Sequence, residues 1–184
     1  MQRDLVIKAQ QGDAEAFGAL ANGAIDRLHG VAYRILRDRD QADDATQQAL
    51  VSAWDHLPGL RDPDRFDAWT YRLVVRAAYK EAHRTQAQRD RVRWMPPDSG
   101  TGTDMPDRIA DHDELEQAFK TLSPEHRAVL TLRYYCDLPL GEIAEILDIP
   151  VGTVGSRLHH ATRHLRDALQ RERRREPTEE HALS

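Results

Sequence analysis

The stretch from residue 138 to residue 166 constrains this chain most, because it has the pattern of two helices joined by a tight turn. Ile143, Ala144 and Leu147 give the first helix an apolar side, and the turn falls at Asp148–Pro150. The second helix has apolar residues at i, i+4, i+7, i+11 and i+15, which form one buried face: Val154, Leu158, Ala161, Leu165 and Leu169. This pattern predicts a helix-turn-helix, whose second helix enters the major groove of DNA.

The opposite side of the second helix is polar and basic, and it carries the candidate DNA contacts. We expect Ser156, Arg157 and His160 to reach bases or phosphates. Arg157 has two possible roles, because a guanidinium can bind either a guanine edge or a phosphate. Thr153 lies near the start of the helix, where backbone N–H groups also attract phosphate. Gly155 costs the helix about 1 kcal/mol relative to Ala, and it allows the backbone to approach DNA closely.

The net charge of −5 conceals a basic segment near the end of the chain. Residues 151–175 contain seven arginines and only two acidic residues, whereas residues 111–150 are strongly acidic. Attraction to phosphate acts over about a Debye length, roughly 8–10 Å, so local charge matters more than the sum. The charge distribution therefore agrees with nucleic-acid binding.

Composition predicts an all-α protein, since 40% of the 184 residues are apolar, only 6% are aromatic, and strand-like alternation is scarce. The single cysteine, Cys136, excludes a disulfide framework and a cysteine-rich zinc site. No apolar run approaches the length of about 18 residues that a membrane helix needs, so we expect no membrane insertion. The first residues do not form a signal peptide, which makes the cytoplasm the expected compartment. We expect no cofactor and no bound metal.

Helical periodicity divides the chain into two small helical domains. The first, residues 1–88, contains four predicted helices: Leu5–Gln11, one capped by Asp13, one that Asp40 caps and that runs to Trp54, and Arg65–Arg84. A loop at His56–Asp64 is marked by Pro58-Gly59 and Asp62-Pro63.

A flexible linker is expected at residues 89–110, where Pro and Gly are dense and the helical period is lost. The second domain, residues 111–175, includes a strong helix start, with Ser123 as N-cap and Pro124 at the first helical position. Residues 176–184 form a polar tail.

The predicted fourth helix carries four cations at intervals of four residues, which we call the basic stripe: Arg72, Arg76, Lys80 and Arg84. Like charges at i and i+4 repel, so an anion such as nucleic-acid phosphate would stabilise the stripe. The alternative is a solvated helix face that acids of neighbouring helices partly balance. Arg61 and Arg65 add charge beside the loop. Phe66, Trp69 and Tyr71 lie nearby; such rings can accept unstacked bases, although Phe66 and Trp69 also suit a core.

The predicted third helix carries a second candidate site at Asp43, Asp44 and Gln47. Asp43 and Gln47 share a face because they are four residues apart. Interaction of acids with the helix dipole also explains the charge, without a specific partner.

Two stretches of the chain resemble extracytoplasmic-function sigma factors of the sigma-70 family. They are AYRILRDRDQADDATQQALVSAWDHL and LSPEHRAVLTLRYYCDLPLGEIAEILDIPVGTVGSRLHHATRHLRDAL. The second alone also suits response-regulator output domains, whereas the pair is specific. The resemblance implies that residues 1–88 form sigma region two and that residues 111–175 form region four.

The resemblance also implies roles and partners. Three residues would dock on the β′ clamp helices of core RNA polymerase: Asp43, Asp44 and Gln47. The first domain would recognise and melt the minus-ten element of promoter DNA through Arg61, Arg65, Trp69, Arg72, Arg76, Lys80 and Arg84. The second domain would rest on the β flap and read the minus-thirty-five element through Thr153, Gly155, Ser156, Arg157, His159, His160 and Arg163. An anti-sigma factor is a further implied partner.

The chain departs from the family pattern at several of these positions. Arg76 stands where such proteins usually have Asn, Lys80 where they have Asp, and Thr70 where they have Leu. Gly155 occupies a position that is often basic, and His160 one that is often Arg. The promoter sequence therefore does not transfer from the family.

Two other functions are alternatives to a sigma factor, which is not itself an enzyme. A stand-alone helix-turn-helix transcription regulator would bind duplex DNA without polymerase and would use its first domain for ligand binding or dimerisation. A metal-dependent enzyme could use His159, His160 and His164, since the last two have the spacing of a helical metal pair. The sequence nearby offers that pair no acidic third ligand, which counts against the enzyme.

Overall fold

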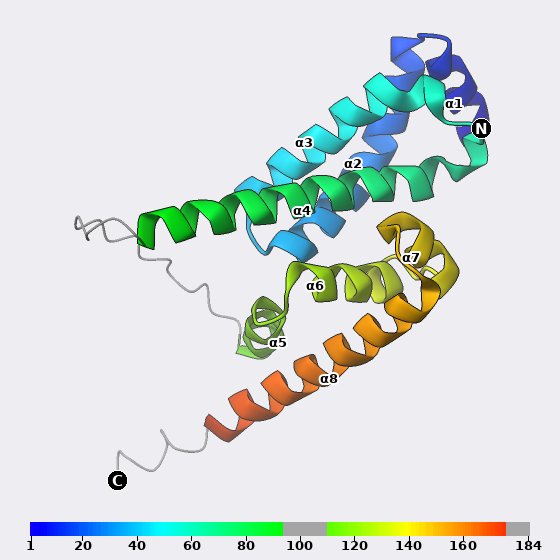
Figure 1. The fold of residues 1–184 in the computed structure, drawn as a ribbon. Helices are drawn as coiled ribbons and strands as arrows, with labels where there is room; N and C mark the ends of the chain where they lie inside the picture. The colour runs from blue at the N-terminus through cyan, green and yellow to red at the C-terminus, as the bar shows by residue number, and fades with distance from the viewer. Residues whose placement is uncertain (94–109, 176–184) are drawn as a thin grey trace.

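The computed structural model describes residues 1–93 and 110–175, with side chains described for 1–88 and 115–171. Every element in these ranges is helical, which confirms the all-α prediction (Figure 1). The elements are α1 (Gln2–Gln10), α2 (Ala14–Leu36), α3 (Arg39–His56), the 3-10 turns η1 (Leu57–Gly59) and η2 (Pro63–Arg65), α4 (Phe66–Arg93), α5 (Ala110–Lys120), α6 (Pro124–Leu130), the π-helical turn η3 (Thr131–Tyr135), α7 (Leu140–Leu147) and α8 (Val151–Arg175). The predicted tail, and the predicted linker beyond Arg93, lie outside the described residues.

The helix starts in the first half follow from capping side chains. The Asp13 carboxylate accepts hydrogen bonds from the N–H groups of Glu15 and Ala16, which confirms it as the N-cap of α2. The prediction that Asp40 caps α3 is wrong, because Asp38 is the N-cap and accepts from the Gln41 N–H. Asp38 has the extended backbone that a cap requires, whereas Asp40 already lies in the first helical turn.

The helix-turn-helix has the predicted form. Ser123 accepts from the His126 N–H and caps α6, with Pro124 at its first position. α7 ends at Leu147, and its C-cap Asp148 has a left-handed backbone (φ 56°) that Asp tolerates better than most residues. α8 begins at Val151, slightly before the predicted start, and its buried side includes Val154 and Ala161, both fully covered.

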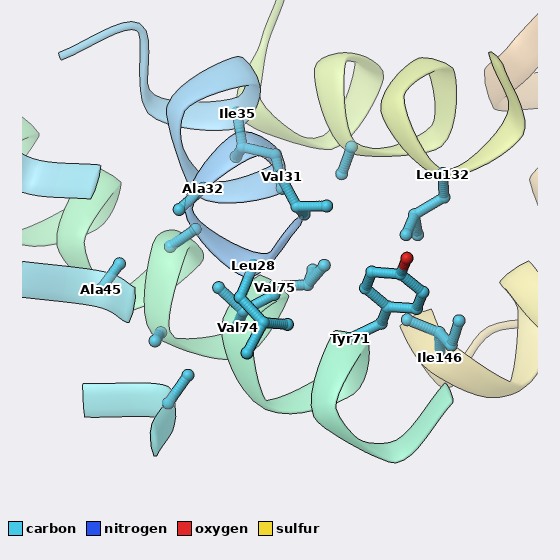
Figure 2. Close-up of a cluster of buried hydrophobic side chains, with 14 of the residues drawn as sticks. Leu28, Val31, Ala32, Ile35, Ala45, Tyr71, Val74, Val75, Leu132 and Ile146 are labelled. Carbon is cyan, nitrogen blue, oxygen red and sulfur yellow. The ribbon is translucent and has the colours of Figure 1, made fainter. Parts of the chain in front are cut away.

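The largest apolar core takes side chains from both halves of the chain. Its members include Leu28, Val31, Ile35, Tyr71, Val74, Val75, Leu132, Ile143 and Ile146. Figure 2 shows Tyr71 of α4 beside Leu132 of η3 and Ile146 of α7. We call this interface of α2 and α4 with α6, η3 and α7 the seam. The sequence predicted two domains on a tether and did not predict the seam.

No helix in the described part of the chain combines the length and the apolarity that crossing a membrane would require.

The corrected cap gives a stability prediction. Asp38→Ala should lower the free energy of unfolding by about 1 kcal/mol, because the Gln41 N–H loses its acceptor. Asp40→Ala, the matched control, should cost clearly less. Urea unfolding of both variants measures the difference, and equal losses would contradict the assignment of the cap.

Candidate nucleic-acid and protein interfaces

The predicted contacts of α8 lie along its outward side. Ser156, His159, His160 and Arg163 are exposed, while three others are half-buried at the edges of this side: Thr153, Gly155 and Arg157. The Ser156 hydroxyl donates to the Thr153 carbonyl at 3.0 Å. Arg163 Nη2 lies 3.2 Å from His160 Nδ1. The α8 surface that faces away from the core is therefore polar and basic, as the sequence indicates.

Arg157 differs from the other residues of this set because it lies close to α4 and α6. Its charge acts on Tyr79 of α4 and on Glu125 of α6. Burial alone would raise the pKa of Glu125, but hydrogen bonds from its own N–H and from Ser123, with the charges of His83 and Arg157, bring this pKa below its usual value. Arg157 thus lies near a half-buried carboxylate of opposite charge, which adds an interaction within the protein to the two roles that the sequence suggests.

Two histidine rings lie beside each other where α6 packs on α8. The ring centroids of His126 and His164 are 5.7 Å apart. Burial and then the charge of His164 lower the pKa of His126, with smaller contributions of the same sign from His160 and Arg157, while Glu125 opposes them. Protonation of His126 is therefore disfavoured in the folded chain.

The basic stripe on α4 is partly neutralised by the protein itself. Arg72 Nη2 donates to the Glu145 backbone carbonyl at 2.6 Å. At the other end of the stripe, Arg84 pairs with Glu81 at 2.5 Å and lies 4.0 Å from Asp44. The two middle cations, Arg76 and Lys80, are exposed, and among the described side chains no acid pairs with them.

The structure thus agrees in part with both interpretations of the stripe, the one with an external anion and the one with balancing acids of neighbouring helices. Successive residues at i and i+4 turn slowly around a helix, so Arg72 faces α7 whereas Arg84 faces α3. Neighbouring acids and carbonyls balance the ends of the stripe, and its centre remains open to an external anion.

A hollow of about 190 Å³ between α4 and α7 is lined by two of the remaining predicted residues of the first half, Arg65 and Trp69. Arg65 forms an ion pair with the carboxylate of Glu145. Trp69 is half-buried and packs against Phe66, with ring centroids 6.1 Å apart, so it is at least partly a core residue. Arg61 is exposed and is not among the residues that line the hollow.

The candidate docking residues of α3 are all exposed. Asp43 Oδ1 lies 3.1 Å from His29 Nε2. Because α3 begins at Arg39, Asp43 and Asp44 lie beyond its first turn, where the influence of the helix dipole has declined. Interaction with the helix dipole therefore does not explain why acidic residues stand at positions 43 and 44.

Sequence reasoning missed two apolar residues on the same face of α3. Val51 and Trp54 are 56% and 41% exposed, and the Trp54 ring meets Phe17 edge-on at 4.9 Å. Val51 follows Gln47 by four residues and Asp43 by eight, so helical spacing could have identified it. We call the exposed side chains of Asp43, Asp44, Gln47, Val51 and Trp54 the α3 face.

Among the described side chains, no group of three His, Cys, Asp or Glu residues could hold a metal ion. The three histidines of α8 considered for a metal site lie on its exposed side.

Comparison with known proteins identifies the class. Residues 22–89 match the model for sigma-70 region 2, and residues 112–165 match a model for sigma-70 region 4. In the structure these two regions correspond to the α2–α4 bundle and to α5–α8 with the helix-turn-helix.

Whole-chain relatives extend the match. The ECF RNA polymerase sigma factor SigL of Mycobacterium tuberculosis H37Rv is 35% identical over 168 residues, which cover 86% of this chain and 94% of SigL. SigW of Bacillus subtilis is 29% identical, and the match covers 92% of this chain and 97% of SigW. The fold resembles that of the sigma factor RpoE of Bartonella quintana in complex with the anti-sigma factor NepR, with a TM-score of 0.68. The sequence identity is 18%, and the match covers 85% of this chain and 98% of RpoE. The chain belongs to the ECF family of RNA polymerase sigma factors.

Gly155 gives a prediction in which stability and binding change in opposite directions. A Cβ at Gly155 would meet nothing within 4 Å, so Gly155→Ala should raise the free energy of unfolding by about 1 kcal/mol. If DNA approaches the backbone there, the same change should weaken promoter binding. Gly23→Ala on α2 is the control, with similarly open space and no expected effect on DNA. Unchanged promoter binding by Gly155→Ala would contradict the close approach.

The His126 pair gives a pH prediction. Its lowered pKa means that the unfolded chain takes up this proton more readily, so the stabilising contribution is present above about pH 6.5 and is lost as the pH falls. The His126→Gln variant should lose less thermal stability than the wild type between about pH 7.5 and 5.5. Melting curves at constant ionic strength test this, with His159→Gln as an exposed control. The same loss in wild type and His126→Gln would contradict it.

Proposed function

We propose that the two halves of this sigma factor divide promoter recognition between them, and that both bind core RNA polymerase. The first half recognises and melts the minus-ten element, and the second reads the minus-thirty-five element. The chain performs no chemistry of its own, since the polymerase makes the RNA, and it needs no cofactor. It acts in the cytoplasm, where polymerase and DNA are found.

The α3 face is the proposed contact with the β′ clamp helices. Its carboxylates and amide provide polar contacts, and Val51 and Trp54 provide exposed apolar area beside them. Aromatic residues are enriched at the centres of protein interfaces, which supports a protein partner for this face over a nucleic acid. The second half would rest on the β flap.

The open centre of the basic stripe is the proposed contact with the minus-ten element. Arg76 and Lys80 present charge to phosphates, and they replace residues that most of the family uses there. Arg61, Arg65, Arg72 and Arg84 add positive charge around them, with Trp69 at the end near the loop. Residues 56–64 would accept the melted strand.

The exposed side of α8 is the proposed contact with the minus-thirty-five element. Ser156, His160 and Arg163 lie at the centre of this side and are the proposed base or phosphate contacts. Thr153, Gly155 and His159 lie beside them. Arg157 lies at the edge of this side, near Glu125 of α6, and is a further proposed base or phosphate contact.

An anti-sigma factor is the proposed regulatory partner. The Bartonella quintana relative of the same fold was crystallised with the anti-sigma factor NepR. This chain presents apolar and aromatic surface on α3 that such a protein could cover in competition with polymerase.

One observation carries the proposal: the first half has an exposed α3 face, and the second half contains a helix-turn-helix. Run-off transcription with purified core polymerase on a genomic promoter library tests it. New start sites that need this protein would support the proposal. Absence of new starts, together with tight duplex binding without polymerase, would instead support a stand-alone regulator.

The open centre of the stripe gives a variant test. Replacing Arg76 and Lys80 by Gln should reduce promoter opening at least about tenfold with little loss of polymerase binding, because phosphate contacts are removed and the α3 face is untouched. Replacing Lys8 and Lys120 by Gln removes the same charge elsewhere and is the control. Permanganate footprinting measures opening, and native gel shift measures polymerase binding. Equal losses in both assays would contradict the assigned role.

A further inference from the structure

We propose that a hollow at the C-terminal end of α2 binds a small phosphate monoester. The hollow has a volume of about 220 Å³ and lies between α2 and α5, and its lining residues are Tyr33, Arg34, Arg37, Leu115, Glu116 and Phe119. Pockets for drug-sized ligands usually have about 300 Å³ or more, so this one suits a smaller molecule. It shares no residue with the α3 face, the basic stripe or the proposed contacts of α8, and the inference does not depend on their roles.

Arg37 is the residue on which this site depends. Its side chain is 8% exposed, and Glu116 forms an ion pair with its Nη2. Within the described part of the chain, neither Nε nor Nη2 has an acceptor in hydrogen-bonding geometry. These two nitrogens form the guanidinium edge that can bind carboxylate or phosphate through two parallel hydrogen bonds. Because buried donors without acceptors are costly, this edge favours binding of an external oxyanion.

The position of Arg37 in the chain is not explained by the end of α2 alone. Arg37 is the C-cap and has a left-handed backbone (φ 60°), a conformation for which glycine is the usual residue at a helix end. Helix C-termini attract cations, and Arg34 fits this role because its Nη1 donates to the Gly30 carbonyl at 3.0 Å. Neither Nε nor Nη2 of Arg37 donates to a carbonyl of α2 in this way. A role in binding accounts for an arginine at this strained position.

A further cation adds positive potential beside the hollow. Burial, and then the charge of Arg37, lower the pKa of Arg127 to about 10, while Glu125 opposes this shift. The Nε of Arg127 is also buried, and no described residue accepts a hydrogen bond from it. The two guanidinium groups therefore repel each other inside the protein, and a bound anion would reduce this repulsion.

Aromatic rings hold the Arg37 guanidinium in one orientation. Its Cζ lies 5.0 Å from the centroid of the Tyr33 ring and 5.7 Å from that of the Phe119 ring. Rings on a cation stabilise it and exclude water, which strengthens its attraction for an anion. Leu115 is 45% exposed and adds apolar surface at the hollow. A phosphate bound to Arg37 would thus have apolar surface nearby for a short carbon group.

The Glu116 carboxylate decides between two classes of oxyanion. An incoming anion must compete with Glu116 for Arg37, and a free carboxylate would only exchange one such group for another. A phosphate monoester carries a charge of about −1.5 to −2 at neutral pH and has three strong acceptor oxygens. The occupant is therefore a phosphate, and the site allows the chain to respond to a small phosphorylated molecule.

An NMR titration of the full chain with methyl phosphate tests the site and its location. At about pH 7.5, where the monoester is mostly doubly charged, the amide signals of residues 33–37 and 115–119 should shift and saturate. Acetate at the same ionic strength should bind there at least about tenfold more weakly, since it has one charge and two oxygens. Shifts confined to the basic side of α8, no shifts, or equal binding of acetate would overturn the proposal.

Replacing Arg37 tests the residue that binds the phosphate. Arg37→Asn should lower the affinity for methyl phosphate at least about tenfold, because the two-bonded edge is lost. Asn tolerates the left-handed backbone, so the end of α2 is kept, and circular dichroism checks the fold. Arg39→Gln removes an exposed positive charge two residues away and should bind as the wild type does. The same affinity in Arg37→Asn and Arg39→Gln would contradict the assignment.

Replacing Glu116 gives an expected gain, which loss of folding cannot imitate. Glu116→Gln removes the competing carboxylate and should raise the affinity for methyl phosphate at least about fivefold. Glu15→Gln removes an exposed negative charge elsewhere and is the control. If the pair of Arg37 and Glu116 serves stability alone, Glu116→Gln will bind no more tightly than Glu15→Gln, and that result would overturn the proposal.

Discussion

Burial of the apolar side of α4 is the constraint on which the rest of the structure depends. Val74, Val75 and Ala78 of this helix are almost fully covered and belong to the core that includes α2 and α3. Tyr71 is buried against η3 and α7 of the second half. A single helix thus contributes to the core of the first half and to the seam, and its orientation determines where its cations lie.

The cations of α4 have different surroundings as a consequence. Arg72 is held by α7, Arg84 by Glu81 and Asp44, and only the middle of the stripe is open. The middle of the stripe and the α3 face are therefore the parts of the first half whose proposed partners meet no competing contact from the second half.

Local features of the fold could be predicted from the sequence. The caps at Asp13 and Ser123 depend on residues within a single turn and were predicted correctly. The apolar face of α8 follows from a repeat along one helix, and on it Val154 and Ala161 are buried while Leu158, Leu165 and Leu169 are half-buried. The pairing of Glu81 with Arg84, three residues apart, is equally local and could have been predicted. The cap of α3 was missed because both Asp38 and Asp40 suit an N-cap, and only the backbone conformation distinguishes them.

The seam could not be predicted, because its contacts join residues far apart in the chain. Arg65 and Glu145 are separated by 80 positions, and neither has a pattern that indicates the other. The apolar residues of α7 have the same pattern whether they pack within an isolated helix-turn-helix or against the first half. Exposure of Val51 and Trp54 was also missed, since aromatic and β-branched residues on a helix usually suggest burial.

Run-off transcription with purified core polymerase measures the central claim most directly. The account predicts start sites that appear only when this protein is added, and a marked loss of them when Arg76 and Lys80 are both replaced by Gln. Start sites that do not depend on the protein, or full activity of the double variant, would contradict it.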